Sequence, residues 1–490
     1  MPDPTTSSPS RRSASTVLLV LVCLAQFMVI LDVSIVNVAL PSIRGDLHFS
    51  ATGLQWVVNA YTLTFAGFLL LGGRAADLVG RRRVFLAGVA LFSVSSLVCA
   101  LASSQGLLLG ARALQGLGGA IVSPASLAII TTSFGEGAER NRALGTWGAM
   151  AGLGGAAGVL FGGLLTQGLG WPAIFVINVP IGLAVVVAAR RVIPESRREA
   201  DAPQRHFDLA GALLVTLGLV AVVYGIVRTD VLGWGSIGVL APLAAGLVLL
   251  AAFAVVEGRI ARDPLIPLRV FAQPLLRAAN LTVLLLGSAL FAMWFFVSLY
   301  LQQVLGYDAL QAGLAFLPMT LTIVAASTQA PRLVARLGVR VVLTVGLGLA
   351  ALGLAWFSRL APGGSYVLDV LPGGLLAATG MGLSLVPATI AAVQGVPASE
   401  SGLASGLINT SRLMGGALGL AALSTLASSR TGSALAGGTA RLAALSDGFD
   451  VAFLAGAGIL VIAAVVAATL VRPAEHGVHG RVPEPVADAA

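Results

Sequence analysis

The chain has 490 residues, of which 57% are hydrophobic and only 10% are charged, whereas soluble domains carry roughly 25% charged residues. This composition excludes a soluble globular protein and indicates a membrane protein that crosses the bilayer many times. All 29 basic residues are arginine and the formal net charge is +8. Without a lysine, the chain holds no P-loop and therefore no ATPase domain of that type.

Cysteine and histidine offer no metal chemistry. Cys23 and Cys99 both lie inside apolar runs, and the four histidines fall in loops or the tail without a second ligand at helical spacing. We therefore expect no metal and no cofactor.

A transmembrane helix needs about 20 apolar residues, and this rule predicts fourteen spans between a disordered tail at 1–15 and a second tail at 472–490. The predicted spans are 16–40, 54–73, 84–102, 105–131, 142–167, 172–190, 208–228, 236–256, 277–302, 309–331, 339–357, 367–388, 402–426 and 449–471.

The distribution of arginines gives the predicted topology. With an even number of spans, both termini lie on one side of the membrane. Of the 29 arginines, five fall in loops on the other side and two fall inside spans, which leaves 22 on the side of the N-terminus. The positive-inside rule then predicts that both termini are cytoplasmic. The net charge is explained by topology and requires no nucleic acid.

Two charged loops, Arg190–Asp208 and Glu257–Arg277, divide the spans into six, two and six. This layout predicts a helix bundle at 16–191, a linker with two extra helices at 192–276, and a second bundle at 277–471. The loop after the second span and the loop after the tenth align weakly when Gly80 is matched to Gly338, which indicates repeated halves.

Asp32 is the only acid placed deep in a predicted span, where an ionised carboxylate is costly. It lies about eight residues, or ~12 Å, from the end of its helix, and Arg112 lies about seven residues, or ~10 Å, from the same side. The arginine would favour the ionised carboxylate, and burial the protonated one. The pair could therefore act as a proton switch, or only as a permanent ion pair that joins two helices.

Other polar residues inside spans are candidates for a substrate cavity. Arg412, with Asn409 one turn away, could contact an anion or a substrate acceptor, or bond to backbone carbonyls. Gln26 and Asn37 share one face of the first span and could line a cavity or bond between helices. Gly154, Gly158 and Gly162 recur every fourth residue, which favours close helix packing or a hinge.

The chain resembles the major facilitator superfamily, specifically its fourteen-span drug:proton antiporters, and the resemblance covers nearly the whole chain. Its motifs are Leu31–Ile43; Gly73, Asp77, Gly80, Arg81, Arg82 and Arg83 in the loop after the second span; Arg112, Gln115, Gly116, Gly118 and Gly119; and Gly162, Gly163, Trp171 and Ile177–Gly182. Val159 and Leu78 depart from the family pattern.

The resemblance implies an all-α membrane protein that exports drugs or antibiotics in exchange for protons, by alternating access, from the plasma membrane. It implies that Asp32 and Arg112 couple the proton, that the loop Gly73–Arg83 gates the cytoplasmic helix ends, that Gly163 belongs to the packing and hinge glycines, and that Gln115 belongs to the substrate cavity. The loop arginines could instead serve topology alone. A proton- or cation-coupled uptake transporter for a small nutrient is the alternative, and an enzyme is disfavoured because no polar catalytic cluster is present.

Overall fold

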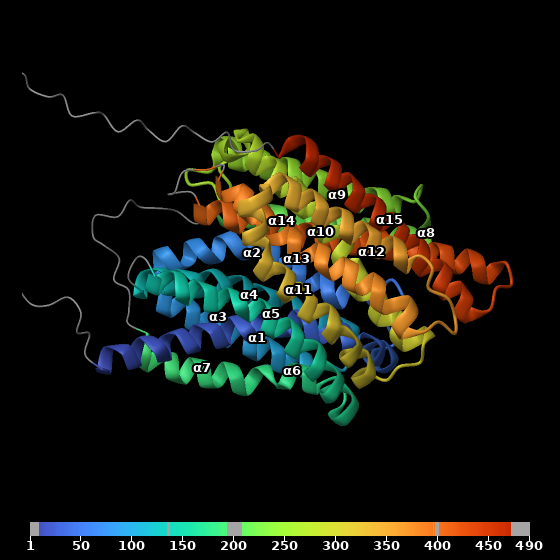
Figure 1. Cartoon of the computed structure of the whole chain (residues 1–490), viewed down its shortest axis with the longest axis horizontal. Coiled ribbons are helices and arrows are strands. Elements are labelled where there is room, and N and C mark those ends of the chain that lie inside the picture. Colours follow the sequence, from blue (N-terminus) through green and yellow to red (C-terminus); the bar gives the residue numbers. More distant parts are fainter. Residues whose placement is uncertain (1–8, 135–137, 194–207, 395, 397–400, 472–490) are drawn as a thin grey trace, which may run out of the picture.

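The computed structural model describes residues 9–134, 138–193, 208–394, 396 and 401–471, and its regular elements within these residues are helices (Figure 1). Their bounds are α1 Pro9–Leu47, α2 Trp56–Val79, α3 Arg81–Ala100, α4 Gln105–Ser133, α5 Ala138–Leu169, α6 Ala173–Val176, α7 Asn178–Val192, α8 Leu209–Leu232, α9 Ile237–Val255, η1 Val256–Ile260, η2 Leu268–Ala272, α10 Pro274–Leu299, η3 Tyr300–Val304, α11 Ala309–Leu337, α12 Val339–Phe357, η4 Tyr366–Val370, α13 Leu371–Gln394, α14 Ser401–Ala436 and α15 Arg441–Leu470.

Thirteen stretches of the described residues are long and apolar enough to cross a membrane. The predicted span 402–426 is not among the thirteen, although it lies within α14, a helix of 36 residues. Its apolar character is diluted by glycines and by the polar run from Asn409 to Arg412. The predicted all-α membrane fold is confirmed, and the thirteen stretches together with α14 correspond to the fourteen predicted spans.

The predicted sixth span is a single crossing built from two helices. The break between α6 and α7 falls at Ile177. Pro180 explains it, because proline has no backbone N–H with which to bond the carbonyl of Val176.

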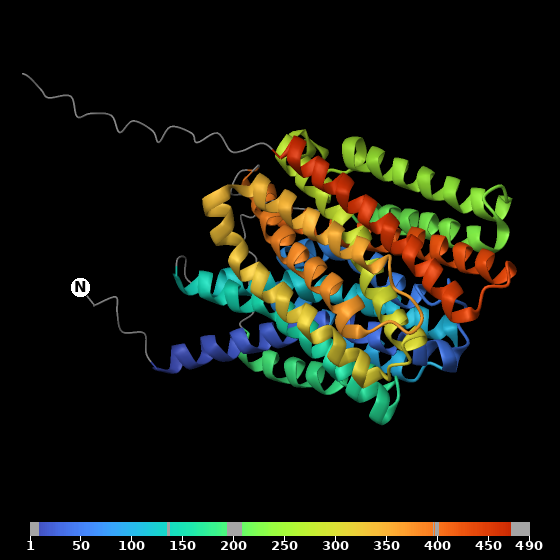
Figure 2. The same ribbon diagram turned by 45° about the vertical axis from the view of Figure 1, so that its right-hand side comes forward.

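The helices pack in two groups with a pair between them in sequence. Helices α1–α7 contact mainly one another, as do α10–α15, while α8 and α9 pair together and α8 also contacts α2 and α14. In Figure 2 the two groups lie one below the other, and the paired green helices flank the second group. Helix α1 begins at the same end of the molecule at which α15 ends (Figures 1 and 2), which we call the terminal end.

The two groups meet through α5 against α11 and through α2 against α14. At the end opposite the termini, Ser298 Oγ donates to the Asn37 carbonyl at 2.6 Å and Gln302 Nε2 donates to the Val38 carbonyl at 3.0 Å. Six residues of α11 are buried between Ala312 and Thr320, but Ala330 is the only buried one between Leu321 and Leu337. The groups are therefore closely packed at the far end and less so toward the terminal end.

The glycines of α5 permit close approach to its neighbours. A Cβ atom on Gly158 would lie 2.6 Å from the Ser34 Cβ, and one on Gly154 would lie 3.0 Å from the Ile30 Cβ. Gly162 has the same relation to Ile35 on α1. Gly163 faces the other group, since its Cβ would lie 2.6 Å from the carbonyl oxygen of Ala309.

The turns at Gly80 and Gly338 have the same form. Each is the single residue between two helices, α2 and α3 or α11 and α12, with φ of 111° at Gly80 and 80° at Gly338. Residues with a Cβ rarely adopt such angles. The alignment made from the sequence thus matches equivalent turns in the two groups.

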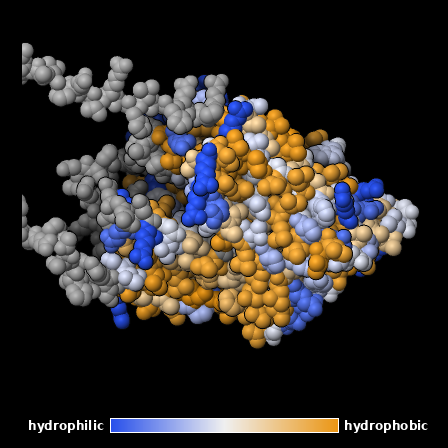
Figure 3. Space-filling model, viewed as in Figure 1, coloured by the Kyte–Doolittle hydropathy of each residue, from blue (hydrophilic) through white to orange (hydrophobic). Residues whose placement is uncertain are grey.

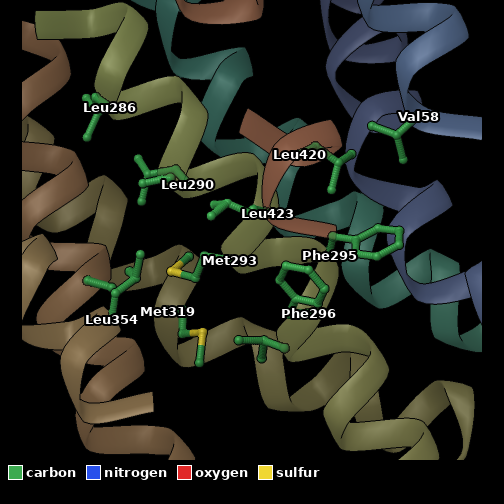
Figure 4. Packing of buried hydrophobic residues seen from close by; sticks show 14 of the residues in the cluster. Val58, Leu286, Leu290, Met293, Phe295, Phe296, Met319, Leu354, Leu420 and Leu423 are labelled. Carbon is green, nitrogen blue, oxygen red and sulfur yellow. The ribbon is translucent and has the colours of Figure 1, made fainter. Parts of the chain in front are cut away.

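Hydrophobic residues dominate the face of the molecule shown in Figure 3, as a lipid-facing exterior requires. The interior is also apolar. Figure 4 shows Phe295 and Phe296 of α10 near Leu420 and Leu423 of α14, with Met293 and Met319 beside them. Against this background, the buried polar groups stand out.

Candidate functional site: a buried ion pair in the first helix group

Asp32 of α1 and Arg112 of α4 face each other in the interior. The Arg112 Nη1 lies 2.5 Å from the Asp32 Oδ2, and the two residues are 1% and 0% exposed. Charge-assisted hydrogen bonds of this kind are about twice as strong as neutral ones. Removing one partner of a buried pair typically costs about 3–5 kcal/mol.

The carboxylate accepts further hydrogen bonds from amide side chains. Gln115 Nε2 donates to Asp32 Oδ1 at 2.7 Å, and Asn178 Nδ2 donates to the same oxygen at 3.1 Å. Both amides also donate to Ser96 Oγ at 3.0 Å, and that hydroxyl donates to the Phe175 carbonyl at 2.9 Å. Together with Arg112, these buried donors give both oxygens of the carboxylate hydrogen-bond partners.

Arg112 has partners that do not depend on Asp32. Its Nε donates to the Val57 carbonyl at 3.0 Å, and its Nη1 also donates to Gln115 Oε1 at 2.7 Å. The guanidinium carbon lies 4.5 Å from the ring centre of Tyr61, which adds a cation–π contact. The arginine therefore keeps favourable contacts if Asp32 takes up a proton and loses its charge.

Sequence reasoning identified Asp32, Arg112 and Gln115 but assigned no role to Ser96, Asn178 or Tyr61. Asn178 lies in one of the family motifs, and this was the available signal. Gln115, which we expected in a substrate cavity, is fully buried and bonded to both members of the ion pair, and its role in substrate binding stays a prediction. We call Asp32, Arg112, Gln115, Ser96 and Asn178 the buried charge network.

The gating-loop residues lie at the terminal end. Arg82 Nη2 donates to the Arg190 carbonyl at 2.6 Å, which links the start of α3 to the last turn of α7. Arg74, next to Gly73, donates to the carbonyls of Asp263 and Pro264. The side chain of Asp77 lies outside the described residues, so its expected role stays a prediction.

The remaining cavity candidates are spread over both groups. Gln26 is buried, and its Oε1 has no hydrogen-bond partner. The Asn37 side chain donates back to the Val33 carbonyl at 3.1 Å. Arg412 is half-buried and its Nη2 donates to Asn409 Oδ1 at 2.8 Å.

Asp32 is not the only buried acid. Glu257, expected in a loop, lies in η1 and is 3% exposed, while Asp208 caps α8 and is 8% exposed. In the sequence, Glu257 and the charged residues after it indicated the start of a loop. In the structure, helical backbone continues from α9 through η1 to Ile260. Within the described residues, no group of three or more His, Cys, Asp or Glu side chains could hold a metal.

A polytopic bundle of two helix groups with a charge network buried in one of them has the architecture of a secondary transporter. The chain belongs to the major facilitator superfamily, whose family model matches residues 22–420. It is therefore related to transporters that carry small molecules.

Curated relatives are similar over most of their length. The chain is 45% identical to the cephamycin export protein CmcT of Amycolatopsis lactamdurans, with 89% of each chain covered. It is 41% identical to the puromycin resistance protein pur8 of Streptomyces alboniger, covering 92% of this chain and 90% of the relative. It is 36% identical to the tetracenomycin C resistance and export protein of Streptomyces glaucescens, covering 84% and 76%.

Solved structures agree on the fold. A bacterial homologue of the human lysosomal transporter Spinster, in an inward-facing and unoccupied conformation, superposes with a TM-score of 0.69 at 19% identity, covering 95% of this chain and 98% of the other. The POT family transporter PepTSo superposes with a TM-score of 0.67 at 16% identity, covering 94% of this chain and 98% of the other.

Proposed function

We propose that this chain exports amphiphilic organic compounds, such as drugs or antibiotics, in exchange for protons. The relatives named for antibiotic export or resistance support the substrate class. The observation that carries the coupling is the Asp32–Arg112 pair, because a fully buried carboxylate is the group that can gain and lose a proton inside the first helix group.

In the proposed cycle, Asp32 is ionised while Arg112 and the two amides contact it. When the helix groups rearrange, Arg112 separates from Asp32 but keeps its hydrogen bonds to the Val57 carbonyl and to Gln115, and Asp32 takes up a proton. Protonation of Asp32 then favours one arrangement of the helix groups, and loss of that proton favours the other. This difference in stability between the two arrangements is what coupling requires. The chain acts as a carrier and performs no covalent chemistry.

The helix groups, bounded at 16–191 and 277–471, rock against each other, with 192–276 as the linker. Packing at the far end supports assigning this structure to the state open toward the termini. The arginine distribution supports cytoplasmic termini and a multi-pass plasma-membrane protein, with the lipid bilayer as its surroundings. Gly154, Gly158, Gly162 and Gly163 serve as the packing surface of α5, and Arg82 holds the gating loop against α7 in this state.

Transport into everted membrane vesicles tests the proposal. Vesicles whose interior is acidified by respiration should accumulate compounds from an amphiphilic panel that includes puromycin, and an uncoupler should abolish the accumulation. A proton-coupled uptake carrier would instead drain the same compounds from preloaded vesicles under this gradient. Vesicles without the protein provide the control.

A further inference from the structure

One face of α10 is directed at α1 in the other helix group. Asn280, Phe291 and Ser298 are spaced eleven and seven residues apart, so they share this face, and Gln302 of η3 follows four residues later. Ser298 and Gln302 bond to the backbone of α1. Phe291 of the same stripe packs against a buried hydrophobic cluster made mostly of first-group residues, so this part of α10 borders the space between the two groups.

Arg412 lies beside this stripe. A Cβ on Gly287 of α10 would lie 2.2 Å from the Arg412 carbonyl oxygen, so the two backbones are very close there. Ser411 Oγ donates to Asn280 Oδ1 at 2.8 Å, and a Cβ on Gly416, one turn further along α14, would meet the Phe291 ring at 2.7 Å. The next residue, Leu413, belongs to the buried cluster of the first helix group, so Arg412 lies between α10 and that group.

The positive charge of Arg412 is not neutralised by a described residue. Its hydrogen bond goes to the neutral amide of Asn409, and no ion pair joins it to a carboxylate in the described part of the chain. Asp32, the buried acid of α1, is engaged with Arg112. Helix α11, which borders the same space, has no acid after its N-cap Asp308. A cation deep in a membrane protein normally has a partner.

A second observation points to a polar ligand in the same space. Gln26 shares the face of α1 that carries Asn37, eleven residues away, and Asn37 lies opposite Ser298. The Gln26 Oε1 is buried without a hydrogen-bond partner. Gln26 lies ten residues into the predicted span 16–40, and Arg412 lies ten residues into the predicted span 402–426, which runs in the same direction. They lie at similar depth.

From this arrangement we infer that Arg412 binds an anionic group, such as a carboxylate, on the exported organic compound. The inference rests on the proposed export function and names its substrate class. The planar guanidinium can bond a carboxylate through two parallel N–H groups. The absence of an acid along α11 gives a dication no matching partner there.

Binding to the purified full-length protein tests this inference without a proton gradient. The probes are diethylaminocoumarin carboxylate and its neutral methyl ester, in nanodiscs of phosphatidylcholine. We expect Arg412→Gln to weaken binding of the acid about 10- to 100-fold, as loss of a charged hydrogen bond does, with little change for the ester. Arg412→Lys should keep most of the preference for the acid. Arg336→Gln, at an exposed arginine on α11, is the matched control.

Equal binding of acid and ester by the unchanged protein would overturn the inference, as would equal loss of both in Arg412→Gln. A second arm uses nanodiscs containing phosphatidylglycerol. If that lipid displaces the acid only when Arg412 is present, the site binds a lipid headgroup and the assignment to substrate is wrong. None of these binding measurements needs a proton gradient. They therefore test the role of Arg412 even if proton-driven export itself is not observed.

Discussion

The Arg112 guanidinium lies 2.5 Å from the Asp32 carboxylate, although 80 residues separate them in the chain. Each belongs to a different helix, and neither is measurably exposed to solvent. The pair is therefore a tertiary feature of the first helix group, and its charges balance only when both residues are present.

The first prediction concerns stability. Asp32→Asn should lower the thermal unfolding temperature of the purified protein, because it leaves Arg112 as an uncompensated buried cation at a cost of about 3–5 kcal/mol. Adding Arg112→Gln should recover most of the loss. Asp447→Asn, which breaks an exposed contact of 3.8 Å to Arg430, is the control and should have almost no effect. A single variant as stable as the unchanged protein would argue against a charged pair.

The second prediction concerns the hydroxyl of Ser96. Ser96→Ala should destabilise the protein by about 1 kcal/mol, because Gln115 and Asn178 each lose an acceptor in a buried site. Thermal unfolding followed by intrinsic fluorescence measures the change. Ser433→Ala, at an exposed hydroxyl on α14, gives the baseline. If the two variants melt alike, Ser96 does not organise the network.

The third prediction concerns closure at the far end. Gly163→Leu should push α11 away from α5, since even a Cβ would lie 2.6 Å from the Ala309 carbonyl oxygen. We expect the population to shift toward the state open at the far end, with lower transport. Cysteines introduced at Gln167 and Asp308, which are exposed and share a hydrogen bond, report the opening through reduced disulfide crosslinking. Gly168→Leu, where nothing lies within 4 Å, should leave the crosslinking unchanged.

Much of the fold was readable from the sequence because the bilayer imposes simple length and charge rules. Apolar length located the spans, and arginine placement gave the topology that we propose. The rules failed where polar residues entered a helix: α14 is less apolar than the other spans, and Glu257 looked like a loop residue. Pro180 is the sequence feature that accounts for the break in the sixth span, which apolar length alone does not predict.

The site was only partly predictable. Asp32 and Arg112 stood out because charge inside hydrocarbon is rare, and helix direction placed them at similar depth. Ser96 and Asn178 did not stand out, because a serine or asparagine in a membrane helix usually bonds its own backbone. Whether these two residues join the buried charge network depends on how α3 and α7 pack against α1. Spacing along the chain does not specify that packing.

Proton-driven accumulation by Asp32→Asn is the most direct test of the account. Everted vesicles with an acidified interior should show accumulation of a substrate by the unchanged protein. With equal amounts of folded Asp32→Asn, we expect no accumulation above the level without a gradient, while exchange of labelled for unlabelled substrate continues. An Asp32→Asn protein that still accumulates substrate against its gradient would contradict proton coupling through this carboxylate.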